Sequence, residues 1–176
     1  MRDRLPDTID AAFLASSGKG TGREYCGDLS IVGMQRLAAS LADTDAPDLQ
    51  VRLHIGRDAG GVQCLEGEIQ GVLHLTCQRC LGRVEFPVQR TFRLALVHSE
   101  AEADRLTDGY EPLLLEDERL VVREVVEDEL LLALPDFPQH SEAETCTLPE
   151  YRDDQETVTV DEKPNPFAAL ASLKRN

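Results

Sequence analysis

Cys77-Gln78-Arg79-Cys80-Leu81-Gly82 separates two long stretches in which apolar and polar residues alternate. Before it, apolar residues of one parity recur from Leu65 to Leu75, and after it they recur from Val84 to Leu96. A period of two is typical of a β-strand with one buried face. A third alternating run covers residues 49–55, and the glycine-rich residues 58–61 after it are a turn signal. The hexapeptide is therefore predicted to be the tip of a β-hairpin in an antiparallel sheet.

Some positions inside these runs do not suit a regular strand. Gly67 and Gly71 fall on the apolar parity, which predicts a bend, a bulge or a close backbone contact. Pro87 cannot donate a hydrogen bond to a neighbouring strand, so it needs a bulge or a sheet edge. Two shorter strands are predicted at residues 24–31 and 111–116.

Three segments carry apolar residues at helical spacing, at residues 8–15, 34–41 and 121–134. The last is the longest, and Pro135 ends it. The sequence therefore predicts an α+β fold. Its sheet is an antiparallel β-sheet or partly closed barrel of three to six strands. One main helix at about residues 121–134 packs on it, with short N- and C-terminal helices.

The chain is expected to form one domain with a tail. Residues 1–147 form the predicted α+β domain, and residues 148–162 an acidic linker with little to bury. Residues 163–176 are predicted to be a docking helix, because Asn165 suits an N-cap and Pro166 the first helical position. A helix this short is only marginally stable by itself in water, so we expect it to pack on the rest of the chain or on a partner. The predicted partner-binding residues are Lys163, Pro164, Asn165, Pro166, Phe167, Leu170 and Leu173.

The charge balance is strongly acidic. Asp and Glu number 33 against 18 for Lys and Arg, a formal net charge of −15. Nucleic-acid binders depend on basic surfaces, so this chain as a whole would be repelled by RNA and a basic protein partner is the easier route. The alternative is that the acidity only keeps the protein soluble. With no apolar run long enough to cross a bilayer and no signal-peptide pattern, the expected location is cytoplasmic.

The five cysteines are too scattered, and odd in number, for a disulfide framework. Cys77 and Cys80 have the spacing of half a zinc site. Cys64 is a poor third ligand, because a strand from it to Cys77 would span about 43 Å at about 3.3 Å per residue. His140 and Cys146 lie in an irregular segment that can fold back to the hairpin. The candidate metal site is thus Cys77, Cys80, His140 and Cys146 around a structural zinc ion. Ordinary reduced cysteines in a turn are an equal alternative to the zinc site, and a redox motif ranks below both because a strand follows, not a helix.

Other catalytic chemistry is sparse. Acidic pairs such as Glu127 and Asp128 are predicted to form a solvated helix face and not a catalytic dyad. No sequence pattern of a Ser-His-Asp triad is present, and the expectation is that the protein is not an enzyme.

Several motifs together resemble one protein family. They are the Cys77–Cys80 turn, the acidic Val126–Glu129 run with Leu132–Pro135, Pro138 with His140, and the tail from Lys163 to Lys174. In combination they resemble the YceD family, bacterial proteins named for large ribosomal RNA subunit accumulation. The resemblance extends from about Leu49 onward, and the Lys163–Phe167 block is its most specific part. It implies a non-enzymatic role in producing or stabilising large-subunit ribosomal RNA during ribosome assembly. Family genes tend to lie beside a gene for a large-subunit ribosomal protein, which suggests a partner.

The leading hypothesis is therefore a ribosome-biogenesis factor that acts as an acidic binding module. Its partner would be a basic ribosomal protein or a large-subunit assembly intermediate, with no membrane involved. One alternative is a zinc-dependent RNA-processing enzyme, which would need a metal with an open coordination position. A third reading is direct RNA binding through Arg79, Arg83, Arg90 and Arg93, and it ranks last because of the net charge.

Overall fold

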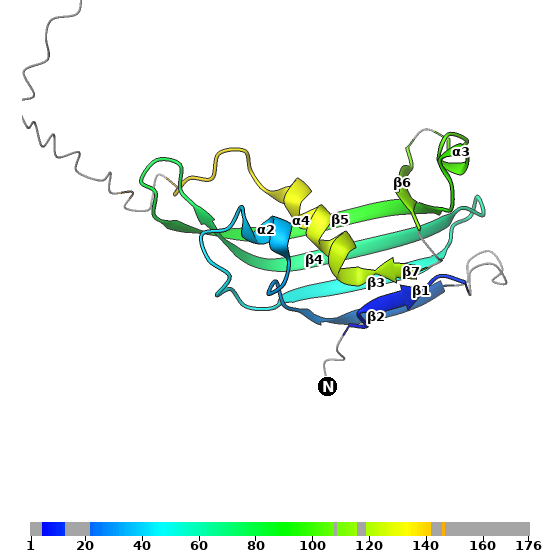
Figure 1. Cartoon of the computed structure of the whole chain (residues 1–176), viewed down its shortest axis with the longest axis horizontal. Coiled ribbons are helices and arrows are strands. Elements are labelled where there is room, and N and C mark those ends of the chain that lie inside the picture. The colour runs from blue at the N-terminus through cyan, green and yellow to red at the C-terminus, as the bar shows by residue number, and fades with distance from the viewer. Residues whose placement is uncertain (1–4, 13–21, 108, 116–118, 142–145, 147–176) are drawn as a thin grey trace, which may run out of the picture.

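The computed structural model describes residues 5–12, 22–107, 109–115, 119–141 and 146. These residues form an α+β structure in which helices lie on one face of a long sheet (Figure 1). The strands are β1 (Thr8–Asp10), β2 (Gly22–Leu29), β3 (Leu49–Arg57), β4 (Gln63–Thr76), β5 (Arg83–Val97), β6 (Glu111–Leu114) and β7 (Arg119–Val121). The helices in this part of the chain are α2 (Gln35–Ala38), α3 (Glu100–Ala103) and α4 (Val122–Ala133). No described helix is long and apolar enough to cross a membrane.

The main sheet has five strands in the order β2-β3-β4-β5-β6. The first four strands are antiparallel neighbours, but β6 runs parallel to β5. The prediction of a purely antiparallel sheet is therefore wrong. Parallel neighbours need a crossover connection, and residues 98–110, which include α3, supply it. In the described residues β2 and β6 remain two separate edges, so the sheet is open and the partly closed barrel is also wrong.

Residues 8–10 form a strand where the apolar spacing predicted a helix. β1 pairs antiparallel with β7, and Ile9 faces Leu120. Ile9 is buried while Thr8 and Asp10 are exposed, which is the alternation of a strand. The partner strand lies more than a hundred residues later in the sequence, so local spacing could not reveal it. The rest of the predicted N-terminal helix, at residues 13–15, and the predicted C-terminal helix lie outside the described residues.

The main core lies between one face of the sheet and α4 with α2. The sheet contributes buried residues of one parity from each long strand, and α4 contributes Val122, Val126 and Leu130. Burying a side chain of this size stabilises the fold by about 1.5–3 kcal/mol. The buried sheet residues are Leu49, Val51, Leu53, Ile55, Leu65, Ile69, Leu73, Val88, Phe92, Leu94 and Leu96.

The irregular positions inside the strands each have a structural reason. Gly67 lies opposite Phe92, and a Cβ at Gly67 would come within 2.0 Å of the ring, so the predicted close contact is present. Pro87 pairs with Val72 without any break in the register of β4 and β5. It needs no bulge, because β6 pairs only with residues 94–97 and leaves the other side of β5 at Pro87 as a sheet edge.

The end of the β4–β5 hairpin positions the candidate site. The chain that leaves α4 runs back towards the hairpin tip (Figure 1). Leu75 and Val84, the last inward residues of the hairpin, form a small second core with Cys77, against which Leu41 and Leu134 pack. The tip is therefore held in place from both the α2 side and the α4 side.

Candidate metal centre

The hairpin tip is a tight turn closed by backbone hydrogen bonds. The N–H of Cys77 donates to the carbonyl of Gly82 at 2.8 Å, and the N–H of Leu81 donates to the carbonyl of Cys77 at 2.9 Å. Leu81 has a φ of 60°, in the left-handed region that a residue with a Cβ rarely adopts. This turn brings the sulfurs of Cys77 and Cys80 to one side of the tip.

The segment after α4 is fastened to the same turn. The N–H of Gln78 donates to the carbonyl of Pro138 at 2.8 Å. Nε2 of His140 lies 2.9 Å from the carbonyl oxygen of Arg83, just after the turn. A carbonyl can only accept, so Nε2 donates, and in the neutral imidazole this leaves the lone pair of Nδ1 for a metal. A backbone carbonyl in this role is the usual outer partner of a metal-binding histidine.

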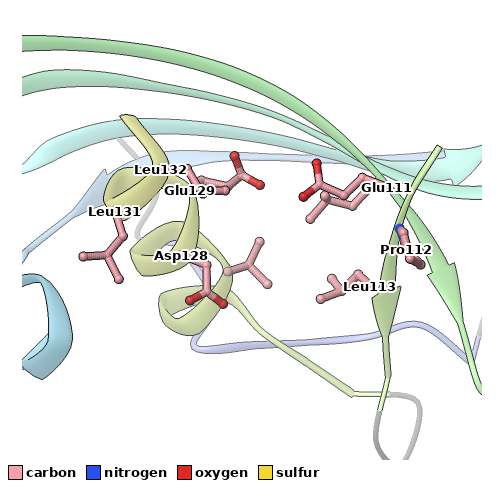
Figure 2. A pocket seen from close by; sticks show the side chains of 9 residues that line it. Glu111, Pro112, Leu113, Asp128, Glu129, Leu131 and Leu132 are labelled. Atoms are coloured by element: carbon pink, nitrogen blue, oxygen red, sulfur yellow. The ribbon is translucent and has the colours of Figure 1, made fainter. Parts of the chain in front are cut away.

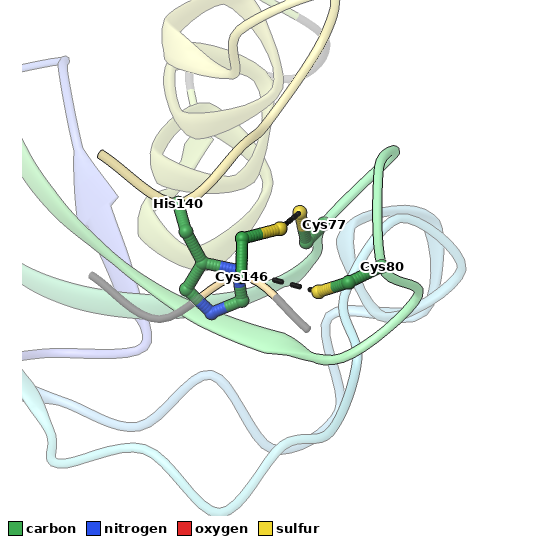
Figure 3. Close-up of side chains that lie close together, drawn as sticks. All are labelled: Cys77, Cys80, His140 and Cys146. Atoms are coloured by element: carbon green, nitrogen blue, oxygen red, sulfur yellow. Dashed lines mark hydrogen bonds between the residues drawn. The ribbon is translucent and has the colours of Figure 1, made fainter. Parts of the chain in front are cut away.

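The structure brings the four predicted ligands together (Figure 3). One donor atom from each of Cys77, Cys80, His140 and Cys146 lies within 4.8 Å of the others. Sγ of Cys77 and Sγ of Cys146 are 3.9 Å apart, and Sγ of Cys80 is 3.4 Å from Nδ1 of His140. Tetrahedral zinc with bonds of about 2.3 Å to sulfur and 2.0–2.1 Å to nitrogen requires separations of about 3.8 and 3.6 Å. These two separations are already close to those that a zinc ion needs.

The electrostatics of the cluster favour a bound cation. Burial alone would raise the pKa of the Cys77 thiol, but backbone N–H groups of Cys80, His140 and Arg79 lower this pKa to about 5. Burial, with the neighbouring sulfurs of Cys80 and Cys77, raises the pKa of the Cys146 thiol to about 11. Ionisation to the thiolate is thus favoured at Cys77 and disfavoured at Cys146. A metal ion among the four donors would favour the thiolate form of every coordinating cysteine, because its positive charge stabilises the negative sulfurs.

The donor set also indicates which metal fits. Three thiolates and one imidazole are soft ligands, which suit zinc and not magnesium or calcium. Four protein ligands complete a tetrahedral shell, as in structural zinc sites. The hairpin tip and the segment after α4 therefore supply a set of four ligands that could hold a metal ion.

Cys64, which the strand length excluded as a third ligand, and His74 both lie outside the cluster. Cys64 is buried near the opposite end of β4, 3.9 Å from a guanidinium nitrogen of Arg93, and burial raises the pKa of its thiol. His74 is buried on the other face of β4 from Cys77, with Nδ1 2.6 Å from a carboxylate oxygen of Asp43. Hydrogen bonding with His74 is the main cause that lowers the pKa of that carboxyl group.

The arginines suggested for direct RNA contact do not form one free patch. Arg83 pairs with Asp43 at 3.5 Å. Arg90 and Arg93 differ by an odd number of positions in an unbroken strand, so they lie on opposite faces of the sheet. Their acidic partners are separate as well, each at 2.8 Å: Glu129 of α4 for Arg90, and Asp58 of the β3–β4 turn for Arg93.

The acidic residues of α4 differ from the predicted solvated face. Asp128 is exposed, but Glu127 and Glu129 are buried. An oxygen of Glu127 accepts hydrogen bonds from the backbone N–H groups of Arg36 at 2.8 Å and Leu37 at 3.0 Å, at the start of α2. Burial opposes ionisation, but these bonds and the Arg36 side chain outweigh it and lower the pKa of Glu127. Sequence reasoning missed this contact, because only the fold places the two helices side by side.

The predicted partner-binding residues at 163–173 lie outside the described residues, so their position stays a prediction. The described fold and cluster define a class: an α+β protein with three cysteines and one histidine clustered at a hairpin tip. The family model described as "Large ribosomal RNA subunit accumulation protein YceD" matches residues 65–174, which include all four cluster residues. A protein of Haemophilus influenzae with the same description is 33% identical over 179 residues, covering 98% of this chain and 97% of that protein.

The chain therefore belongs to the YceD family. The resemblance inferred from the motifs is confirmed. No solved structure matches the chain.

Proposed function

We propose that this protein is a non-enzymatic ribosome-biogenesis factor of the cytoplasm, needed for the synthesis, processing or accumulation of large-subunit ribosomal RNA. The observation that carries the proposal is family membership over nearly the whole chain, because the relative is named for the accumulation of this RNA. That name describes an accumulation factor and no catalysed reaction.

The protein acts in this proposal as an acidic module that binds a basic partner. The net charge of −15 favours association with a basic ribosomal protein or a large-subunit assembly intermediate carrying one. The ion pairs of Arg83, Arg90 and Arg93 support the same choice, because acidic side chains already neutralise three of the four arginines suggested for RNA. Direct RNA binding is the weaker alternative.

Residues 163–176 are proposed to add a docking helix to this module, through Phe167, Leu170 and Leu173. The test is affinity capture from a cell lysate at low salt, with the full chain and with a variant lacking residues 163–176. A variant with Phe167→Ser and Leu170→Ser is the subtler control. The full chain should recover a large-subunit protein or precursor particle, and both variants should recover less. Recovery of no ribosomal component by the full chain contradicts the proposal.

The cluster of Cys77, Cys80, His140 and Cys146 is proposed to hold one structural zinc ion. Metal analysis of the purified chain should give one zinc per molecule. Cys77→Ser and Cys80→Ser should lose it, while Cys26→Ser, an exposed cysteine outside the cluster, should keep it. Zinc retained by both cluster variants would contradict the assignment.

The same experiment addresses the zinc-dependent RNA-processing enzyme as an alternative. Such an enzyme needs an open metal position for water or substrate, whereas four protein ligands fill the tetrahedral shell. We therefore expect the zinc-loaded chain to leave ribosomal RNA uncut. Cleavage by the wild-type chain that is absent in Cys77→Ser, and that a chelator abolishes and added zinc restores, would favour the enzyme instead.

A further inference from the structure

Helix α4 carries more apolar surface than the sheet covers. Val122, Val126 and Leu130 are buried, whereas Val121 just before the helix is 37% exposed and Leu132 is 62% exposed. Positions 125, 128 and 132 follow helical spacing and lie along one side of α4, and Val121, the last residue of β7, precedes them. A second, partly apolar stripe therefore runs along α4 beside the one that packs on the sheet.

Strand β6 forms a wall opposite this stripe. It is an edge strand, hydrogen-bonded only to β5. Leu113 is half-buried and Leu114 is 51% exposed. Figure 2 shows side chains of α4 and β6 on the two sides of the space between them.

Two adjoining cavities lie between these walls, and together we call them the α4–β6 groove. A cavity of about 440 Å³ lies at the Leu132 end, and a cavity of about 570 Å³ lies at the Val121 end. Leu113, Val125 and Asp128 line both cavities. Three of the six large apolar side chains that are exposed in the described residues line this groove: Leu114, Val121 and Leu132. Such a concentration of exposed apolar surface is typical of a binding site.

The rim of the groove is acidic. Exposed Glu111 lines the Leu132 end, exposed Glu124 lines the Val121 end, and Asp128 lies between them. Among the described lining residues Arg119 is the one cation, although Arg36 from α2 also reaches Asp128. An occupant with positive charge on its flanks is therefore favoured over an acidic or purely apolar one.

We propose that the α4–β6 groove binds an amphipathic, basic helix of the partner protein, and this rests on the proposed function as an acidic binding module. Apolar side chains of that helix would cover Leu114, Val121 and Leu132. Its lysines and arginines would face Glu111 and Glu124 at the two ends. This is the helix-in-groove mode of recognition, in which a few apolar anchors supply most of the affinity.

The test uses a fluorescent model peptide of leucine and lysine with helical spacing, about four turns long, and the full-length chain. A peptide of the same composition in scrambled order is the control. Fluorescence anisotropy should show binding of the amphipathic peptide only. Leu114→Gln and Leu132→Gln should each weaken it about tenfold, the loss typical of a buried anchor. Val32→Gln, at another exposed apolar residue but outside the groove, should leave it unchanged.

Charge is tested separately. The double variant Glu111→Gln with Glu124→Gln should weaken binding and reduce its dependence on salt. Glu100→Gln, an exposed glutamate of α3, should do neither. Circular dichroism establishes that each variant is folded before its affinity is compared.

Several results would overturn the proposal. Equal binding of the scrambled peptide, or unchanged affinity in both leucine variants, excludes specific recognition by this groove. Much tighter peptide binding after deletion of residues 163–176 would mean that the chain's own tail, and not a partner, occupies it. Capture of ribosomal proteins that survives both groove variants would also overturn it while leaving the proposed function intact. If the full chain captures none but the peptide still binds selectively, the proposed function fails and the groove stands.

Discussion

Replacement of Glu127 should reveal how strongly α4 holds α2. In Glu127→Ala, the N–H groups of Arg36 and Leu37 lose a charged acceptor at 2.8 and 3.0 Å. The N–H group of Leu37 is buried and is then left without this hydrogen-bond acceptor. A hydrogen bond to a charged group contributes about 1.5–3 kcal/mol, so for two such bonds we expect a loss of about 3–6 kcal/mol in the free energy of unfolding. In Glu127→Gln the amide oxygen can still accept both bonds, and bonds to a neutral acceptor are roughly half as strong. That variant should lose about 1.5–3 kcal/mol.

Urea unfolding followed by circular dichroism measures both changes. Asp128→Asn is the matched control. The carboxylate of Asp128 is exposed, so its ion pair with Arg36 should contribute little to the free energy of unfolding. The reasoning is refuted if Glu127→Gln costs as much as Glu127→Ala, or if neither variant is less stable than Asp128→Asn.

The same carboxylate gives a pH dependence with a defined sign. The pKa of Glu127 in the folded chain is lowered from the ordinary value of 4.5. The folded state therefore binds the proton less readily than the unfolded state, and the stabilisation is complete above about pH 4.5–5. It is lost as the pH falls through the lowered, folded-state pKa. The stability difference between wild type and Glu127→Gln should consequently shrink on acidification, and a difference that grows would contradict the assigned direction.

Three further perturbations test other parts of the structure. Gly67→Ala should lower stability by about 1–3 kcal/mol, because its Cβ would overlap the Phe92 ring, and Phe92→Leu in the same chain should restore part of the loss in urea unfolding. Arg90→Met should lower stability by about 2–3 kcal/mol, because it leaves buried Glu129 without its charge partner, whereas Arg52→Met at an exposed strand position should barely move the urea midpoint. Removal of zinc with a chelator should lower the melting temperature of the wild-type chain, and unchanged melting would argue against a structural metal.

The sequence predicted the long strands well, because each has one buried face and an unbroken alternation. The β4–β5 hairpin and the grouping of Cys77 with Cys80 follow from that pattern. The local spacing around Ile9 predicted a helix, but residues 8–10 form a three-residue strand that pairs with β7, far away in the sequence. Local patterns carry no information about such pairing.

The parallel position of β6 was missed for a related reason. Alternation shows that a segment is extended, but not which way it runs beside its neighbour. The burial of Glu127 and Glu129 was also out of reach, because a carboxylate on a helix is normally solvated unless the fold supplies donors. In contrast, the position of His140 and Cys146 beside the hairpin was predictable. Both are metal-ligand residue types, and both lie in an irregular segment that can fold back to the Cys77–Cys80 turn.

The role in large-subunit ribosomal RNA accumulation is tested most directly in cells that lack the gene for this protein. The measurement is the ratio of large-subunit to small-subunit ribosomal RNA, with the wild-type gene or a version lacking residues 163–176 returned to the cells. We predict that the ratio falls without the gene, recovers with the wild-type chain and recovers less with the truncated one. A ratio that does not change when the gene is absent would contradict the account.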